Sequence, residues 1–216
     1  MIVPQSLTYA HRHLYYLSQP ISGKETSLWI VFHGYGQLAN YFLRKFAPFT
    51  SEDRLIVAPE GLNRQYLNGF SGRVGANWMT KHERSTAIEN TNIYLNALMS
   101  ELLARLPHLQ VVHSLGFSQG AATMSRWICQ TDISLDKVIF WGGAPAYDLE
   151  PDLLREQLQN CRVLVARGEA DPFLETEQFR EAQARMLEAG IPDLRTFTYP
   201  GGHELEPALL KQLFLM

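Results

Sequence analysis

Two kinds of segment alternate along the chain. Short runs that are almost entirely apolar, such as LWIVFH and RLIVAP, alternate with longer segments that place an apolar residue at every third or fourth position. The first kind is typical of strands buried on both faces of a parallel sheet, and the second of amphipathic helices. The pattern predicts strands at residues 28–33, 54–59, 110–117, 137–143, 161–168 and 194–200, and helices at 38–46, 86–105, 119–130, 149–158, 175–189 and 204–213.

This alternation predicts an α/β fold with a mostly parallel central sheet and helices on both faces. Two regions depart from the pattern. The segment LTYAHRHLYYL, residues 7–17, mixes polar and apolar positions, and we expect it to form antiparallel strands at the edge of the sheet. Residues 60–85 are polar and contain several glycines and asparagines, which predicts a long loop. Loops of that length often carry function.

Composition narrows the class of protein. Of the 216 residues, 46% are apolar and 19% are charged, and the net charge is −3. This length fits one domain, residues 1–216, and this apolar content excludes a disordered chain. Because the sequence has no basic cluster, we expect no nucleic-acid partner. It also has no run of 18 apolar residues, no signal-like start and only two cysteines, so we expect no transmembrane segment and a cytoplasmic location.

The segment GFSQG, residues 116–120, matches the pattern G-x-S-x-G. It ends one predicted strand and opens the following predicted helix. A serine in that position is expected on a strained turn, with its hydroxyl exposed above the sheet. Gly116 and Gly120 fit this turn, because side chains there would collide with it. The sequence therefore predicts Ser118 as a nucleophile.

A serine hydroxyl needs a base, and the base needs an acid that holds it. In this kind of site the chain order is serine, acid and histidine, each after a strand. Asp171 and His203 each follow a predicted strand in that order, so we predict a catalytic triad of Ser118, Asp171 and His203. Glu169 stays open as an alternative acid.

The segment HGYGQ, residues 33–37, follows the first predicted strand. A tetrahedral intermediate needs two hydrogen-bond donors aimed at its oxyanion, and we predict the backbone N–H groups of Tyr35 and Gln119. His33 is expected to brace this loop. His11 and His13 could chelate a metal ion, but no third ligand lies near them in the sequence, so no metal site is predicted.

The predicted chemistry is hydrolysis of a small-molecule carboxylic ester or thioester through an acyl-enzyme intermediate, and it needs no cofactor. The substrate pocket is harder to read from the sequence. Aromatic and thioether side chains near the predicted loops could line an apolar acyl site; these are Trp78, Phe70, Met79, Phe173 and Tyr147.

Two alternatives stay open. Gly34-x-Gly36-x-x-Ala39 after a strand fits a loose dinucleotide-binding pattern, and Glu60 follows the next strand, near the position of a ribose-binding acid. A nicotinamide-dependent enzyme would leave the serine, acid and histidine unexplained. The other alternative is a hydrolase-like domain that binds a ligand or protein without catalysis. Labelling by a fluorophosphonate would separate the hydrolase from both.

Together HGYGQ, GFSQG, the Asp171 loop and Gly202-His203 resemble the α/β-hydrolase superfamily. Within it, the chain is similar to the small phospholipase/carboxylesterase group, which includes acyl-protein thioesterases. The resemblance covers nearly the whole chain, and GFSQG is typical of the group. Asn77-Trp78-Met79 looks like the tryptophan-bearing loop of the group but departs from its usual Trp-Phe-Asp form. The resemblance implies a metal-independent serine esterase or thioesterase and a possible homodimer.

Overall fold

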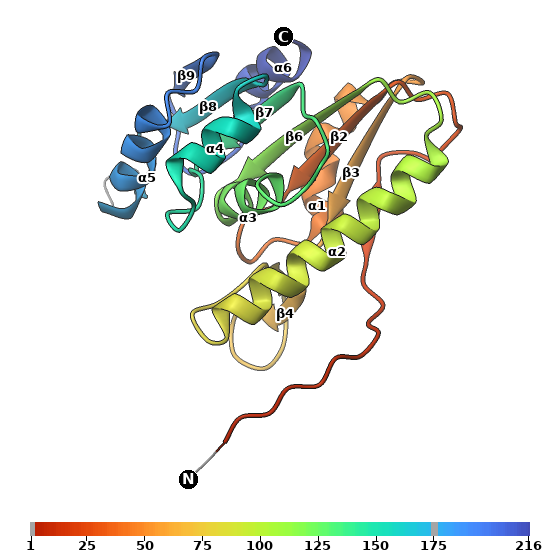
Figure 1. Cartoon of the computed structure of the whole chain (residues 1–216), viewed down its shortest axis with the longest axis vertical. Helices are drawn as coiled ribbons and strands as arrows, with labels where there is room; N and C mark the ends of the chain where they lie inside the picture. Colours follow the sequence, from red (N-terminus) through yellow and green to blue (C-terminus); the bar gives the residue numbers. More distant parts are fainter. Residues whose placement is uncertain (1–2, 174–176) are drawn as a thin grey trace.

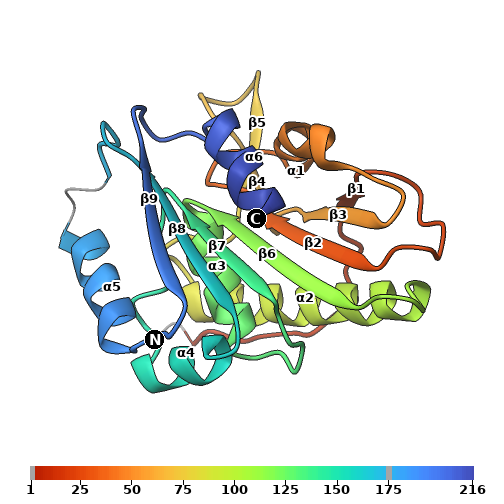
Figure 2. The same cartoon turned by 90° about the horizontal axis from the view of Figure 1, so that it is seen from above.

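A central sheet of seven strands, in the order β1-β3-β2-β6-β7-β8-β9, organises the molecule, with helices on both of its faces (Figures 1 and 2). The computed structural model describes residues 3–173 and 177–216. The sheet strands are β1 (Tyr15–Leu17), β2 (Ser27–Phe32), β3 (Arg54–Pro59), β6 (Val111–Phe117), β7 (Lys137–Trp141), β8 (Arg162–Gly168) and β9 (Leu194–Tyr199). The helices are α1 (Ala39–Leu43), the 3-10 helix η1 (Arg44–Phe49), α2 (Arg84–Arg105), α3 (Gln119–Ile128), α4 (Pro151–Leu158), α5 (Glu177–Glu188) and α6 (Pro207–Leu215).

The fold class is the predicted one. Six strands are parallel, and β1 pairs with β3 in the antiparallel direction. Each predicted strand and helix is present within a few residues of its expected bounds, although the predicted start of α5 at residue 175 lies outside the described residues. Across the described part of the chain, every helix is too short or too polar to cross a membrane.

Two sequence-based expectations need correction. The N-terminal segment contributes the single three-residue strand β1. Residues 3–14 form no strand; His13 and Leu14 still bond to Glu60 after β3, and the start of the segment extends away from the sheet (Figure 1). Residues 60–85 are not a plain loop, because β4 (Asn63–Tyr66) and β5 (Val74–Asn77) pair as an antiparallel hairpin. Most of β4 and the turn between the strands face solvent, so the segment is polar and lacks the apolar run of a buried strand.

Alternate residues along the strands point into two separate cores. In β2, Leu28, Ile30 and Phe32 face a core that α2, α3, α4 and α5 complete. Trp29 and Val31 face the opposite core, which α1, η1 and α6 cover. Burial on both faces explains why these strands read as continuous apolar runs.

The chain changes direction across the sheet at β2. This strand lies between β3 and β6, and the long helix α2 carries the chain over from one side to the other. The loops that follow β2 and β6 therefore diverge at the carboxyl edge of the sheet. Ligands of open α/β sheets bind at such a switch point.

Candidate active site

Ser118 lies at the turn between β6 and α3. Its backbone angles, φ 55° and ψ −121°, are unusual for a residue with a side chain. The glycines two positions before and after Ser118 are required because a side chain at either position would clash with the backbone. A Cβ atom on Gly116 would lie 2.5 Å from the Cα of Ala121, and one on Gly120 would lie 2.4 Å from the carbonyl oxygen of Phe32. The sharp turn expected from the sequence is confirmed, together with the reason for its glycines.

The three predicted catalytic side chains form one chain of hydrogen bonds. His203 Nε2 lies 2.8 Å from Ser118 Oγ, and His203 Nδ1 lies 2.7 Å from Asp171 Oδ2. The Asp171 side chain is fully buried, whereas the imidazole of His203 is 20% exposed. The other carboxylate oxygen of Asp171 accepts the backbone N–H of Phe173 at 2.9 Å. Asp171 is thus held in a fixed orientation beneath the imidazole.

Glu169, the alternative acid, is exposed to solvent. Its backbone N–H pairs with the carbonyl of Tyr199 at the end of β9. The carboxylate that lies against His203 is that of Asp171. The geometry therefore favours Asp171 over Glu169 as the partner of the imidazole.

His33 holds the loop that follows β2. Its Nε2 accepts the backbone N–H of Gly61 at 2.9 Å, so the ring proton is on Nδ1, which lies 2.8 Å from the carbonyl of Gly34. Burial lowers the pKa of His33 to about 4 and keeps the ring neutral. Its ring also stacks on Trp78, with the centroids 4.8 Å apart. The expected bracing role of His33 is confirmed.

The two predicted oxyanion donors, the amides of Tyr35 and Gln119, belong to the loop after β2 and to the start of α3. Gly34 packs directly against Ser118, since a Cβ atom on Gly34 would lie 3.2 Å from Ser118 Cβ. The amide of Gly34 donates to the side chain of Gln37, and that of Gly36 donates to the carbonyl of Ala76. Within the described residues, neither the N–H of Tyr35 nor that of Gln119 at the start of α3 has a hydrogen-bond partner. Both stay available for an oxyanion.

Comparison with known proteins supports the architecture. No protein-family model and no curated protein matches the sequence, but solved structures do. Esterase PE8 is 21% identical, with a TM-score of 0.66, over 94% of this chain and 100% of that one. Acyl-protein thioesterase 2 of Zea mays is 14% identical, with a TM-score of 0.70, over 93% and 96% of the two chains. A phospholipase/carboxylesterase of Dyadobacter fermentans is 17% identical, with a TM-score of 0.67, over 97% and 99%.

The chain has the α/β-hydrolase fold. The predicted fold class is confirmed, and the solved structures that share it include esterases and thioesterases. In this fold the nucleophile lies after a central strand and the acid and base follow later strands. Ser118 after β6, Asp171 after β8 and His203 after β9 occupy those positions.

The α/β-hydrolase fold does not assemble the five predicted pocket residues into one site. Trp78 is buried, and with Met79 it lines a cavity of only about 10 Å³, the space of about one water molecule. Phe70 is 99% exposed in the turn of the hairpin, and Tyr147 lies under the guanidinium of Arg84. Phe173 does lie at the site, with its ring edge-on to His203 at 4.7 Å.

The dinucleotide alternative fits the same loop poorly. One carboxylate oxygen of Glu60 accepts the N–H of Ala39 at the start of α1, and the other pairs with Arg64 at 2.7 Å. The place where a phosphate would meet this helix thus already holds a carboxylate.

Of His11 and His13, the two candidate metal ligands, His13 lies 2.9 Å from the carbonyl of Glu60, and the described residues hold no cluster of three metal-ligating side chains.

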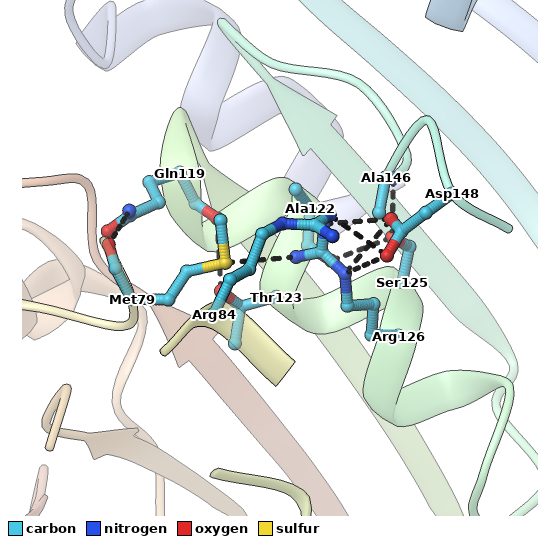
Figure 3. Close-up of polar contacts among 9 residues, drawn as sticks. All are labelled: Met79, Arg84, Gln119, Ala122, Thr123, Ser125, Arg126, Ala146 and Asp148. Atoms are coloured by element: carbon cyan, nitrogen blue, oxygen red, sulfur yellow. Dashed lines mark hydrogen bonds and ion pairs between the residues drawn. The ribbon is translucent and has the colours of Figure 1, made fainter. Parts of the chain in front are cut away.

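Sequence reasoning missed the side chain of Gln119. Its amide makes two bonds to one backbone segment, accepting from the N–H of Trp78 at 3.0 Å and donating to the carbonyl of Met79 at 2.9 Å. Figure 3 shows the bond between Gln119 and Met79 beside a second cluster that is built on Arg126. The indole N–H of Trp78 in turn donates to the carbonyl of His33. Gln119 and Trp78 together therefore link the start of α3 to the end of β2.

The cluster built on Arg126 joins α3 to the loop after β7 (Figure 3). Arg126, almost fully buried, donates to Asp148 through two nitrogens at 3.1 and 2.9 Å, and Arg84 pairs with the same carboxylate at 2.9 Å. Burial would raise the pKa of Asp148, but its bonds from Arg126 outweigh this and lower the pKa. A third nitrogen of Arg126 lies 4.0 Å from the sulfur of Met79. These contacts support α3 behind the serine.

Two aromatic residues hold the loop that carries His203. The indole N–H of Trp141 donates to the carbonyl of Glu204 at 2.8 Å and to the hydroxyl of Tyr199 at 3.1 Å. The hydroxyl of Tyr199 donates to the same carbonyl at 2.5 Å. The sequence alone indicates only that Trp141 and Tyr199 are core residues of strands. Nothing near them in the sequence indicates a hydrogen bond to a distant segment.

Proposed function

We propose that this protein is a serine hydrolase that cleaves carboxylic esters or thioesters through an acyl-enzyme intermediate. The observation that carries the proposal is the unbroken chain from Asp171 through His203 to Ser118, with bonds of 2.7 and 2.8 Å. The esterase and thioesterase names among the solved neighbours support the same reaction class.

In the proposed mechanism, His203 Nε2 takes the hydroxyl proton of Ser118 as the serine oxygen attacks the carbonyl carbon of the substrate. Asp171 holds the proton of Nδ1 and stabilises the imidazolium that forms. The amides of Tyr35 and Gln119 stabilise the oxyanion of the tetrahedral intermediate. His203 then protonates the leaving alcohol or thiol, and water activated by the same ring releases the acid. Phe173, beside the imidazole, is the proposed contact for the substrate.

Serine labelling tests this proposal. Ser118→Ala should abolish both labelling by a fluorophosphonate and the hydrolysis of p-nitrophenyl butyrate, with a loss of at least about 10⁴-fold in kcat. The control is Ser134→Ala, which changes an exposed serine outside the site and should leave both unchanged.

A panel of p-nitrophenyl esters and acyl thioesters of increasing chain length would then rank the substrates. Labelling that persists in Ser118→Ala would place the nucleophile elsewhere. A wild type that is inactive on the whole panel and resists labelling would favour the non-catalytic binding module.

A further inference from the structure

A groove of about 430 Å³ lies between α1 and the β4–β5 hairpin. Its volume is within the range of small-molecule sites in proteins. The apolar part of its lining comes from Leu38 and Phe42 on one side and Val74 on the other. The mechanism proposed above assigns no role to this groove.

Two cations face the groove from different elements. Lys45 belongs to η1, which continues α1, and Arg73 immediately precedes β5. Neither has an ion-pair partner among the described residues, and no acidic side chain of that part of the chain lines the groove. Three other arginines of the hairpin, α2 and α3 differ in this respect: Arg64, Arg84 and Arg126 are each paired with a carboxylate.

The groove is continuous with the loop that flanks the serine. Gly36 and Gln37 line it, and Gly34, two residues earlier, packs against Ser118. Two residues span at most about 7 Å. A substrate with a short chain would therefore reach from the serine to the groove. Because Gly36 donates to the carbonyl of Ala76 in β5, the hairpin wall is fixed to this loop.

We propose that this groove binds an anionic group of the ester substrate. Lys45 and Arg73 would hold a carboxylate or phosphate, because an unpaired ammonium and guanidinium are the usual partners of such groups. Leu38, Phe42 and Val74 would contact the short apolar chain that joins the anion to the ester. The inference rests on the proposed hydrolase function and narrows its substrates to esters that carry a negative charge. The anion belongs either to the acyl part or to the alcohol part.

Matched pairs of esters test this inference. The first arm compares the mono-p-nitrophenyl esters of five- and eight-carbon dicarboxylic acids with the esters of the monoacids of equal length. The second arm compares the butyryl ester of glycerol phosphate with that of glycerol. In the wild type, kcat/KM should favour the anionic ester by roughly 5- to 30-fold in one arm. The preference should shrink as salt screens the charges.

The variant Lys45→Gln/Arg73→Gln should lose this preference and keep its activity on neutral esters. Its control is Lys81→Gln/Lys211→Gln, which makes the same change in net charge at two exposed lysines outside the groove and should keep the preference.

A preference confined to the first arm would assign the anion to the acyl part, and one confined to the second would assign it to the alcohol. Hydrolysis of neutral esters without any anionic preference, or a preference that survives Lys45→Gln/Arg73→Gln, would overturn the inference and leave the proposed function standing. An NMR titration with glutarate and with glycerol phosphate gives a readout that does not need turnover. If all esters are inactive and neither anion perturbs groove residues, both proposals fail.

Discussion

The two ends of the central strands both carry polar groups, and these are organised in opposite ways. At the amino ends, Lys137 begins β7 and donates to the carbonyls of Leu213 and Phe214 in the last turn of α6, at 3.1 and 3.4 Å. His113, near the start of β6, lies 3.5 Å from Asp136. At the carboxyl ends, His203 bonds to both Ser118 and Asp171.

Burial is therefore a poor marker of the site, since both ends bury polar groups. Burial and, to a lesser extent, the charge of Arg162 lower the pKa of Lys137 to about 8. The Lys137 ammonium is bound at the C-terminal end of α6, where a positive charge stabilises the free carbonyls of the helix. At the carboxyl edge the chain of bonds instead ends on a partly exposed hydroxyl, on a residue with strained backbone angles. A chain of hydrogen bonds that ends at an accessible nucleophile distinguishes the candidate site from a structural cluster.

After removal of the serine itself, changing the buried acid should give the largest effect at the carboxyl edge. Asp171→Asn keeps the shape of the side chain but no longer stabilises the imidazolium, so kcat/KM on one ester should fall about 10²–10⁴-fold, or about 3–5 kcal/mol. Glu169→Gln, two residues away, is the matched control and should cost less than about tenfold. Circular dichroism checks folding. The opposite ranking of the two variants would make Glu169 the acid.

The second prediction concerns acid stability at the amino edge. Burial lowers the pKa of His113 to about 4, against the opposing effect of Asp136. The unfolded chain therefore takes up this proton first as the pH falls below about 6.5, and folding loses up to roughly 3 kcal/mol by pH 4. In His113→Gln, the drop in the free energy of unfolding between pH 7 and pH 4.5, measured in urea, should be smaller. His82→Gln, at an exposed position, should leave the drop unchanged. An equal drop in His113→Gln and wild type would contradict the assigned pKa.

The smallest effect is expected at Lys137. In Lys137→Met the carbonyls of Leu213 and Phe214 lose a donor, while removal of a buried charge offsets part of that cost. We expect a net loss of about 1 kcal/mol and a fall in Tm of about 2–4 °C. The kcat/KM should not change, because the amino edge takes no part in the proposed reaction. Lys211→Met on the exposed face of α6 is the control. A drop in kcat/KM would show that the two ends of the strands are coupled.

Much of the site follows from local sequence pattern. The turn at Ser118 follows from the G-x-S-x-G pattern between an apolar strand and a helix. The two glycines leave room for the sharp turn. The order of Asp171 and His203 after later strands follows from the parallel sheet, whose carboxyl ends meet at one edge. His33 was also placed correctly, since a histidine that ends a buried strand has backbone groups within reach.

The sequence by itself thus determined the fold class, the positions of the helices and of the six parallel strands, and three candidate catalytic residues. The family resemblance implied a possible homodimer, and the sequence predicted a cytoplasmic location; both stay predictions. The tertiary structure alone decided the β4–β5 hairpin, the contacts of Gln119, the pairing of Arg126 with Asp148, and the groove that Lys45 and Arg73 line. The physical reason is the range of the contacts. Periodicity and turn chemistry record which face of an element is buried, whereas these features depend on which side chains from distant segments meet, and that is set only when helices and loops pack onto the sheet.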